Sequence, residues 1–166
     1  MRKYLTESSA KILANSLILP YFDYCSCAWS NCSQTLKDVL IKQHKKMARV
    51  VRRVDHTVPT NQVLGRLRWM TLEERWRLNT CKAVFKTLHG NMPEYVQELI
   101  TPLGNIHSYR TRNTSYYGLI IPQVKTQAGK KSFSHYASCI WNQLPAEVRN
   151  ATSLQAFVRA YISHLG

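Results

Sequence analysis

The sequence predicts a mostly α-helical fold: a helical bundle, then a loop and short-strand excursion, then C-terminal helices. Apolar residues fall at helical spacing in 36–54 and 133–144. Capping residues and helix breakers bracket most of the other stretches, and only one short run, 119–124, has a composition that favours a strand. We therefore expect a helical region over 1–102, an irregular or extended basic segment over 103–131, and a C-terminal helical segment over 132–166 that packs on the rest.

The first half of the chain divides into helices at its breakers and capping residues. Residues 7–19 have helix-forming composition, and Pro20 kinks or restarts that helix because proline lacks the N–H of a helix interior. Residues 21–31 are expected to continue as a buried, aromatic-rich segment. Further helices are expected over 36–54, 60–67, 72–89 and 93–100, bounded by Val58-Pro59, by a capping box from Thr71 to Glu74, and by Gly90 and Pro102.

The second half begins with a change of character. Residues 103–131 are rich in Gly, Ser, Thr and Asn, which predicts an extended excursion or small hairpin. Helix is expected again over 132–143, as a short turn after Pro145, and over 153–165. Large apolar groups share one face of the first of these, which indicates packing into a core; they are Phe133, Tyr136, Ile140, Trp141 and Leu144. Asn142 is expected to end that helix.

The charge of the chain is strongly positive and unevenly placed. It has 23 Lys and Arg against 9 Asp and Glu, for a formal net charge of +14. Residues 37–77 hold eleven of the Lys and Arg residues and only four of the Asp and Glu residues, whereas the charges of residues 1–36 are nearly balanced. Such an excess predicts attraction to polyanions, meaning nucleic acid or an acidic membrane surface.

Residues 36–54 separate into two opposite arcs on a helical wheel. The apolar arc holds Leu36, Val39, Leu40, Gln43, Met47, Val50, Val51 and Val54, and we expect it to face the core. The cationic arc holds Lys42, Lys45, Lys46, Arg49, Arg52 and Arg53. These cations repel one another, at about 0.2–0.5 kcal/mol for each pair one turn apart, and only Asp38 offsets them within the helix.

Three interpretations of the cationic arc stay open. It can be a solvated face, a face that binds the phosphate backbone of nucleic acid, or a basic amphipathic helix for an anionic membrane or a calmodulin-like partner. The nucleic-acid interpretation is favoured because basic side chains accompanied by aromatic residues recur later in the chain.

The five cysteines form no disulfide framework and are expected to be reduced thiols of an intracellular protein. Cys25, Cys27 and Cys32, with His44 downstream, lack the paired spacing of a zinc site and are expected to pack in the core. The apolar run near the N-terminus is interrupted by polar residues and Pro20, so neither a signal peptide nor a membrane span is predicted.

The sequence offers little for catalysis. His135 and Cys139 lie one helical turn apart, but a nucleophile and base also need an orienting group. Two-metal chemistry needs clustered carboxylates, and the three aspartates, Asp23, Asp38 and Asp55, are far apart in the sequence. No polymerase or nuclease activity is expected from these residues alone.

Several motifs occur in a specific order along the chain. They are Leu-Pro-Tyr-x-Asp-Tyr-Cys within 15–36, Leu-x-x-Arg within 67–96, Thr-Arg within 107–113, and Lys-x-Ser-Phe and Trp-Asn-x-Leu-Pro within 129–161. This series resembles the region that follows the polymerase palm in reverse transcriptases of non-LTR retrotransposons, of the LINE-like, jockey type. The resemblance also includes 46–51 and covers nearly the whole chain.

The resemblance implies thumb-like helices, up to about residue 100, that cradle a primer–template duplex. It implies a non-catalytic accessory region of an RNA-directed DNA polymerase that binds RNA, RNA–DNA hybrid or DNA without reading its sequence. Family members carry an Ala-Asp-Asp or similar palm motif upstream, which these 166 residues lack. The chain is therefore expected to be a fragment or truncated copy without cofactor or metal of its own, with Mg²⁺ held by the palm as an upstream partner domain.

Together, charge and resemblance single out ten cations for nucleic-acid binding. They are Lys42, Lys45, Lys46, Arg49, Arg52, Arg53, Arg110, Arg112, Lys130 and Lys131. A nuclear or cytoplasmic location without membrane contact is expected. The alternative, from another class of function, is that the chain is an isolated remnant of a degenerate retrotransposon, with a structural or protein-interaction role and no activity.

Overall fold

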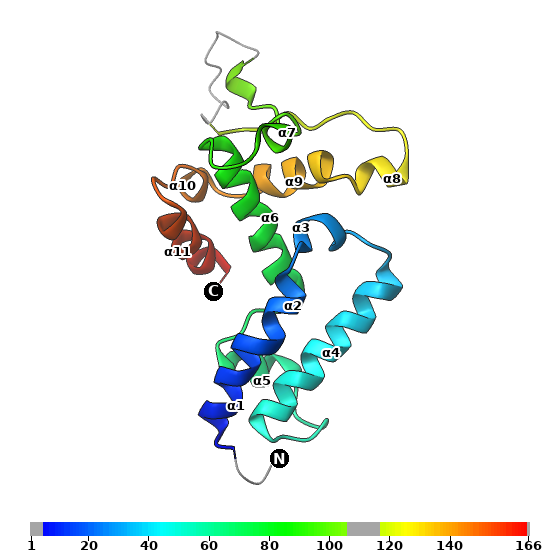
Figure 1. Ribbon diagram of the computed structural model, residues 1–166, viewed down its shortest axis with the longest axis vertical. Coiled ribbons are helices and arrows are strands. Elements are labelled where there is room, and N and C mark those ends of the chain that lie inside the picture. The colour runs from blue at the N-terminus through cyan, green and yellow to red at the C-terminus, as the bar shows by residue number, and fades with distance from the viewer. Residues whose placement is uncertain (1–4, 106–116, 166) are drawn as a thin grey trace. The chain divides into compact units, whose positions relative to one another are not determined.

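The computed structural model describes residues 5–105 and 117–165. These residues are mostly helical and contain no strand, which confirms the predicted fold class (Figure 1). The chain divides into two compact units, Met1–Trp76 and Arg77–Gly166. The division falls inside helix α6 (Leu72–Leu88).

The first unit begins with three consecutive helical segments, α1 (Glu7–Leu13), the π-helical turn η1 (Ala14–Ile18) and α2 (Leu19–Asp23). Thr6 caps α1 by accepting a hydrogen bond from the Ser9 N–H. The wider turn precedes Pro20, which has no N–H to donate to the carbonyl four residues earlier. The Leu19 N–H donates to the Ala14 carbonyl instead, and α2 restarts with Pro20 in its first turn.

Three further helices complete the body of this unit, α3 (Ser26–Trp29), α4 (Gln34–Arg52) and α5 (Thr60–Leu67). Residues with positive φ mark their boundaries: Cys25 (49°) precedes α3, Arg53 (55°) ends α4 and Arg68 (54°) ends α5. None is glycine, so each conformation costs some backbone strain that the surrounding contacts must offset. The expectation of a buried 21–31 segment is wrong in part: Tyr21 and Tyr24 are 82% and 77% exposed.

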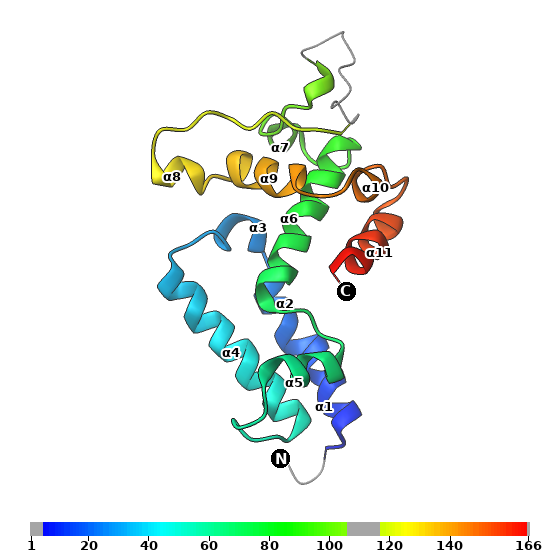
Figure 2. The same cartoon turned by 180° about the vertical axis from the view of Figure 1, so that it is seen from behind.

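The core of the first unit lies where α1, α4 and α5 meet. Helix α5 lies behind α1 in Figure 1 and in front of it in Figure 2. Small and branched side chains fill this junction: Ala14, Ala48, Val51, Val63, Leu64 and Leu67, all 4% exposed or less.

The buried face of α4 differs from the predicted one. His44, Ala48 and Val51 are buried, whereas Leu36 (57%), Val39 (53%) and Val50 (41%) are exposed. The helix is thus rotated by roughly a quarter turn from the orientation that its apolar arc predicts. Two features explain this: Ala48 is small enough for close helix packing, and Arg49 ties the helix to the start of α5. The Arg49 guanidinium donates to the Thr60 hydroxyl (2.8 Å) and the Val58 carbonyl (3.4 Å).

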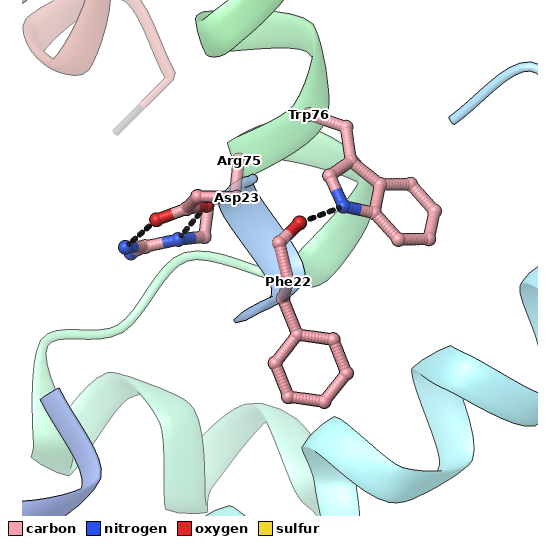
Figure 3. A network of polar contacts seen from close by, with 4 residues as sticks. All are labelled: Phe22, Asp23, Arg75 and Trp76. Carbon is pink, nitrogen blue, oxygen red and sulfur yellow. Dashed lines mark hydrogen bonds and ion pairs between the residues drawn. The ribbon is translucent and has the colours of Figure 1, made fainter. Parts of the chain in front are cut away.

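The start of α6 is bonded to the end of α2 (Figure 3). Arg75 donates from Nε to Asp23 Oδ1 (2.6 Å), and its terminal nitrogen lies 2.5 Å from Asp23 Oδ2. The Trp76 indole N–H donates to the Phe22 carbonyl at 3.0 Å. The predicted capping box is present, because the Thr71 hydroxyl accepts from the Glu74 N–H (3.3 Å) and the Glu74 carboxylate from the Thr71 N–H (2.9 Å).

The described part of the second unit contains the remainder of α6 and six shorter helical segments. Helix α6 ends before Gly90, whose φ of 69° suits glycine at a helix end. The segments that follow are α7 (Glu94–Gln97), η2 (Leu103–Asn105), α8 (Gln127–Lys130), α9 (Phe133–Asn142), α10 (Ala146–Arg149) and α11 (Leu154–Leu165).

Aromatic rings form the centre of the second unit. Phe157 of α11 lies 5.1 Å from Phe85 of α6 and 5.5 Å from Trp141 of α9, measured between ring centroids. Phe157 and Trp141 are fully buried. Ile140, Trp141 and Leu144 of the predicted apolar face are buried and Phe133 and Tyr136 half-buried, so this face does pack into a core.

Asn142 does more than end α9. Its side-chain amide pairs with the backbone of Leu119, accepting from the N–H at 2.9 Å and donating to the carbonyl at 2.8 Å. Trp141 donates to the Tyr117 carbonyl at 2.6 Å. Within the described residues the predicted strand-like run makes one bridge, between Pro102 and Leu119, and Asn142 takes the other edge of Leu119. The Trp and Asn of the Trp-Asn-x-Leu-Pro motif therefore hold the backbone at Tyr117 and Leu119 by hydrogen bonds, and we call this contact the clamp.

We predict that Asn142→Ala destabilises the protein by roughly 2–4 kcal/mol, because it leaves the buried N–H and C=O of Leu119 without partners. Urea unfolding followed by circular dichroism measures this. Gln143→Ala changes the neighbouring, exposed side chain and serves as the control. Equal effects of the two substitutions would contradict the clamp.

We further predict a coupling of about 1 kcal/mol between Asp23 and Arg75, whose side chains are 28% and 31% exposed. A double-mutant cycle of Asp23→Asn and Arg75→Gln measures it. Arg77→Gln removes an exposed charge from the same helix and should show no coupling to Asp23. A coupling indistinguishable from zero would remove the pair from any role in stability.

Candidate nucleic-acid interface

The cationic face of α4 divides into two classes of side chain. The lysines Lys42, Lys45 and Lys46 are exposed, and none of their ammonium groups makes an ion pair or hydrogen bond within the described residues. The Asp38 carboxylate, one turn before Lys42, accepts from the Gln34 amide at 2.8 Å and forms no ion pair with these lysines within the described residues.

The three arginines of the same face take part in internal contacts. Arg49 binds Val58 and Thr60, as described above. Arg52 is paired with Glu7 of α1 at 2.5 Å, and this hydrogen bond lowers the pKa of the Glu7 carboxyl. Arg53 donates to the Leu5 carbonyl. Their guanidinium groups thus hold α4 against α1 and the loop before α5, whereas the lysines make no such contact within the described residues.

The lysine spacing suits a phosphate backbone. Lys46 lies four positions after Lys42, which corresponds to about 6 Å along the helix axis. Successive phosphates of one strand rise about 3.4 Å each along a duplex, so flexible ammonium groups at this spacing can reach two or three of them. Such contacts position a duplex without reading its bases.

The other predicted binding residues fall outside α4. Lys130 ends α8 and Lys131 follows it, and both are exposed side chains of the second unit. The short helix is capped by the Thr126 hydroxyl, which accepts from the Gly129 N–H. A Cβ at Gly129 would lie 3.0 Å from the Cβ of Val124, so glycine permits this close packing. Arg110 and Arg112 lie outside the described residues.

His44 is a buried ring, 2% exposed, between two aromatic side chains. Ring centroids of Phe22 and Trp69 each lie 5.9 Å from its own. Burial lowers the pKa of His44 to about 4, and the positive charges of Arg75 and Lys45 add to this against the opposing effect of Asp23. The residue is therefore a neutral packing group at physiological pH.

The cysteines do not gather at a metal site. Within residues 5–105 and 117–165, no group of three or more His, Cys, Asp or Glu side chains lies close enough to hold a metal ion. All five cysteines are free thiols. The expected core packing is wrong for Cys25, which is exposed, because this residue adopts the left-handed turn between α2 and α3. Cys27 and Cys32 are half-buried.

His135 and Cys139 do contact each other, with 3.8 Å between Nδ1 and Sγ. The part of the chain that the structure describes provides no polar partner for the other ring nitrogen of His135. Within residues 5–105 and 117–165, no side chain therefore takes the place of the orienting group that a catalytic base requires.

The exposed apolar surface of α4 is the feature that the sequence analysis missed. Of its apolar arc, Leu36, Val39 and Val50 are exposed, Leu40 and Met47 are half-buried, and Val54 lies beyond the end of the helix. Helical spacing does define this face, but spacing alone cannot tell a face that packs internally from one that stays exposed.

No family model, curated protein or solved structure matches this chain. None of the described helices is both long enough and apolar enough to cross a membrane.

We predict that stability falls as pH is lowered from about 6.5 to about 4, in part because His44 must be deprotonated in the folded state. The unfolded chain, with an ordinary histidine pKa of 6.5, binds a proton in this range that the folded protein, with a pKa of about 4, does not. At pH 4.5 the loss is about 2–3 kcal/mol relative to neutral pH. His44→Leu should flatten the profile by this amount in urea unfolding at each pH. His56→Leu, which replaces an exposed histidine, should leave it unchanged.

Proposed function

We propose that this chain is a non-catalytic accessory region of a retrotransposon RNA-directed DNA polymerase that binds the nucleic-acid backbone without sequence preference. The observation that carries the proposal is the group of exposed lysines on α4, Lys42, Lys45 and Lys46, which have no partner among the residues that the structure describes. The net charge of +14 supports it, because long-range attraction draws a polyanion to such a protein.

The ordered motifs supply the proposed family, and their contacts support a role without catalysis. Asp23 of the first motif is bound to Arg75 of the second. Trp141 and Asn142 of the last motif hold the backbone at Tyr117 and Leu119. These residues therefore act in folding, which leaves the solvent-facing lysines for the ligand.

The expected ligand is RNA, RNA–DNA hybrid or DNA, since phosphate contacts are common to all three. In the proposed enzyme an upstream palm domain would supply the catalytic carboxylates and bind Mg²⁺. The proposed location is the nucleus or cytoplasm. The arginines of α4 are expected to contribute mainly through the position they give the lysines.

We predict that Lys42→Gln, Lys45→Gln and Lys46→Gln together weaken binding to an RNA–DNA hybrid by about tenfold or more at about 0.1 M salt. Removing three phosphate contacts should also reduce the slope of log K against log salt concentration by about 2–3. Fluorescence anisotropy over a salt series with hybrids of unrelated sequence measures both quantities. The loss should be the same for every sequence.

The control variant removes the same charge elsewhere, with Lys11→Gln, Lys86→Gln and Lys125→Gln. It should show the smaller loss expected from net charge alone. Equal losses in the two triple variants would contradict an interface on α4. Loss of all binding by the unaltered protein near 0.15 M salt, the physiological value, would favour the alternative of a structural or protein-interaction remnant.

A further inference from the structure

The first unit has an open apolar groove of about 440 Å³ between its N-terminal helices and α4. Leu13, Ile18 and Phe22 line one wall, and Gln43, Met47 and Val50 line the other. Its volume lies in the range of about 300–1,000 Å³ that is typical of pockets for apolar ligands. The groove is separate from the cationic face except at Lys46, which lines its edge.

The apolar surface continues outside the groove. Leu13 (42%), Ile18 (45%) and Val50 (41%) are exposed at its walls. On the same helices Ile12 (66%), Leu17 (61%) and Val39 (53%) are exposed as well. A surface of this kind extends along two helices, which suits an extended occupant better than a small molecule.

The wall formed by α4 has the spacing by which helices pack together. Gln43, Met47 and Val50 line it at intervals of four and three residues, and Leu36 and Leu40 continue the same spacing towards the start of α4. This is the spacing of a heptad seam, and an amphipathic helix with the same spacing can interdigitate with it. An amphipathic helix laid in a groove is a common mode of peptide recognition.

The positive charge around the groove favours an occupant that carries acidic side chains. Among the described residues that line it, none is a carboxylate and Lys46 alone is charged. The nearby acid of α1, Glu7, is already paired with Arg52. Lys42, one turn before Lys46, is exposed and unpaired within the described residues. Acidic side chains beside the apolar face of an occupant would therefore meet uncompensated positive charge.

We infer that this groove is the docking site for an amphipathic helix of a partner protein, with an apolar face flanked by Asp or Glu. A second copy of the chain fits less well, because two molecules of net charge +14 repel each other. The inference does not depend on nucleic-acid binding, because the apolar side chains that line the groove are not among the proposed phosphate ligands; the two sites share only Lys46 and its neighbour Lys42.

The test uses the full chain and labelled 21-residue helical peptides with Leu at the a and d positions of three heptads. One peptide carries Glu at the e and g positions, and its control carries Lys there. Fluorescence anisotropy near physiological salt should show binding of the Glu peptide and at least tenfold weaker binding of the Lys peptide. NMR shifts of Leu13, Ile18 and Val50 should locate the Glu peptide in the groove.

The double substitution Leu13→Ser and Val50→Ser should weaken binding of the Glu peptide at least tenfold. Circular dichroism checks that this variant is folded. The control, Ile121→Ser with Ile162→Ser, replaces side chains of similar exposure (43% and 47%) in the second unit and should bind like the unaltered chain. Affinity of the groove variant for RNA–DNA hybrid should stay unchanged. This separates failure of the docking site from failure of the lysine face.

Several outcomes would overturn the inference. One is equal affinity for the Glu and Lys peptides, or no binding of either. A second is equal loss of binding in the groove variant and the control variant. A third is self-association in sedimentation that the groove substitutions abolish, because a second copy would then be the occupant. Binding of anionic phosphatidylserine vesicles that the same substitutions abolish would assign the groove to lipid.

Discussion

The pairing of Asp23 with Arg75 is the contact on which the first unit depends. The two residues lie 52 positions apart, and their two parallel hydrogen bonds, with the Trp76–Phe22 bond beside them, fix the end of α2 to the start of α6. Everything between them, including α3, α4 and α5, is thereby closed into one loop of chain. His44 packs under the same junction against Phe22, so a neutral ring lies close to the ion pair.

The cations of α4 have two roles: the arginines bind other parts of the first unit, and the lysines face solvent. Arginine has a planar group that can donate to several acceptors at once, and the helix uses it for Val58, Thr60, Glu7 and Leu5. Lysine is a compact and strongly hydrated charge, and the three lysines point to solvent. The division explains how a helix with six cations on one face can be stable: half of them are neutralised or hydrogen-bonded by neighbouring elements.

The sequence predicted the helices well because their boundaries are local. Capping at Thr71, the break at Pro20 and the ends near Gly90 and Pro145 all follow from nearby residues. Three features could not be predicted. The rotation of α4 depends on Ala48 and Arg49 meeting residues of other elements, and the clamp at Asn142 joins positions 23 residues apart. The internal use of Arg52 and Arg53 likewise depends on contacts with the N-terminal segment. In the candidate site, the lysines could be predicted by type and spacing, but which cations stay accessible is a tertiary property.

The π-helical turn before Pro20 also affects how the chain can change in evolution. Such a turn contains one residue more than an α-helical turn over the same rise. Deleting a single residue from Ala14–Ile18 would remove this extra residue, so the helices on either side would keep their orientation but would have to join through a regular α-helical turn. Proline is poorly tolerated after such a turn, because its ring clashes with the carbonyl four residues earlier. The number of residues in this segment is therefore constrained together with Pro20, and a deletion here would be costly unless the proline were replaced as well.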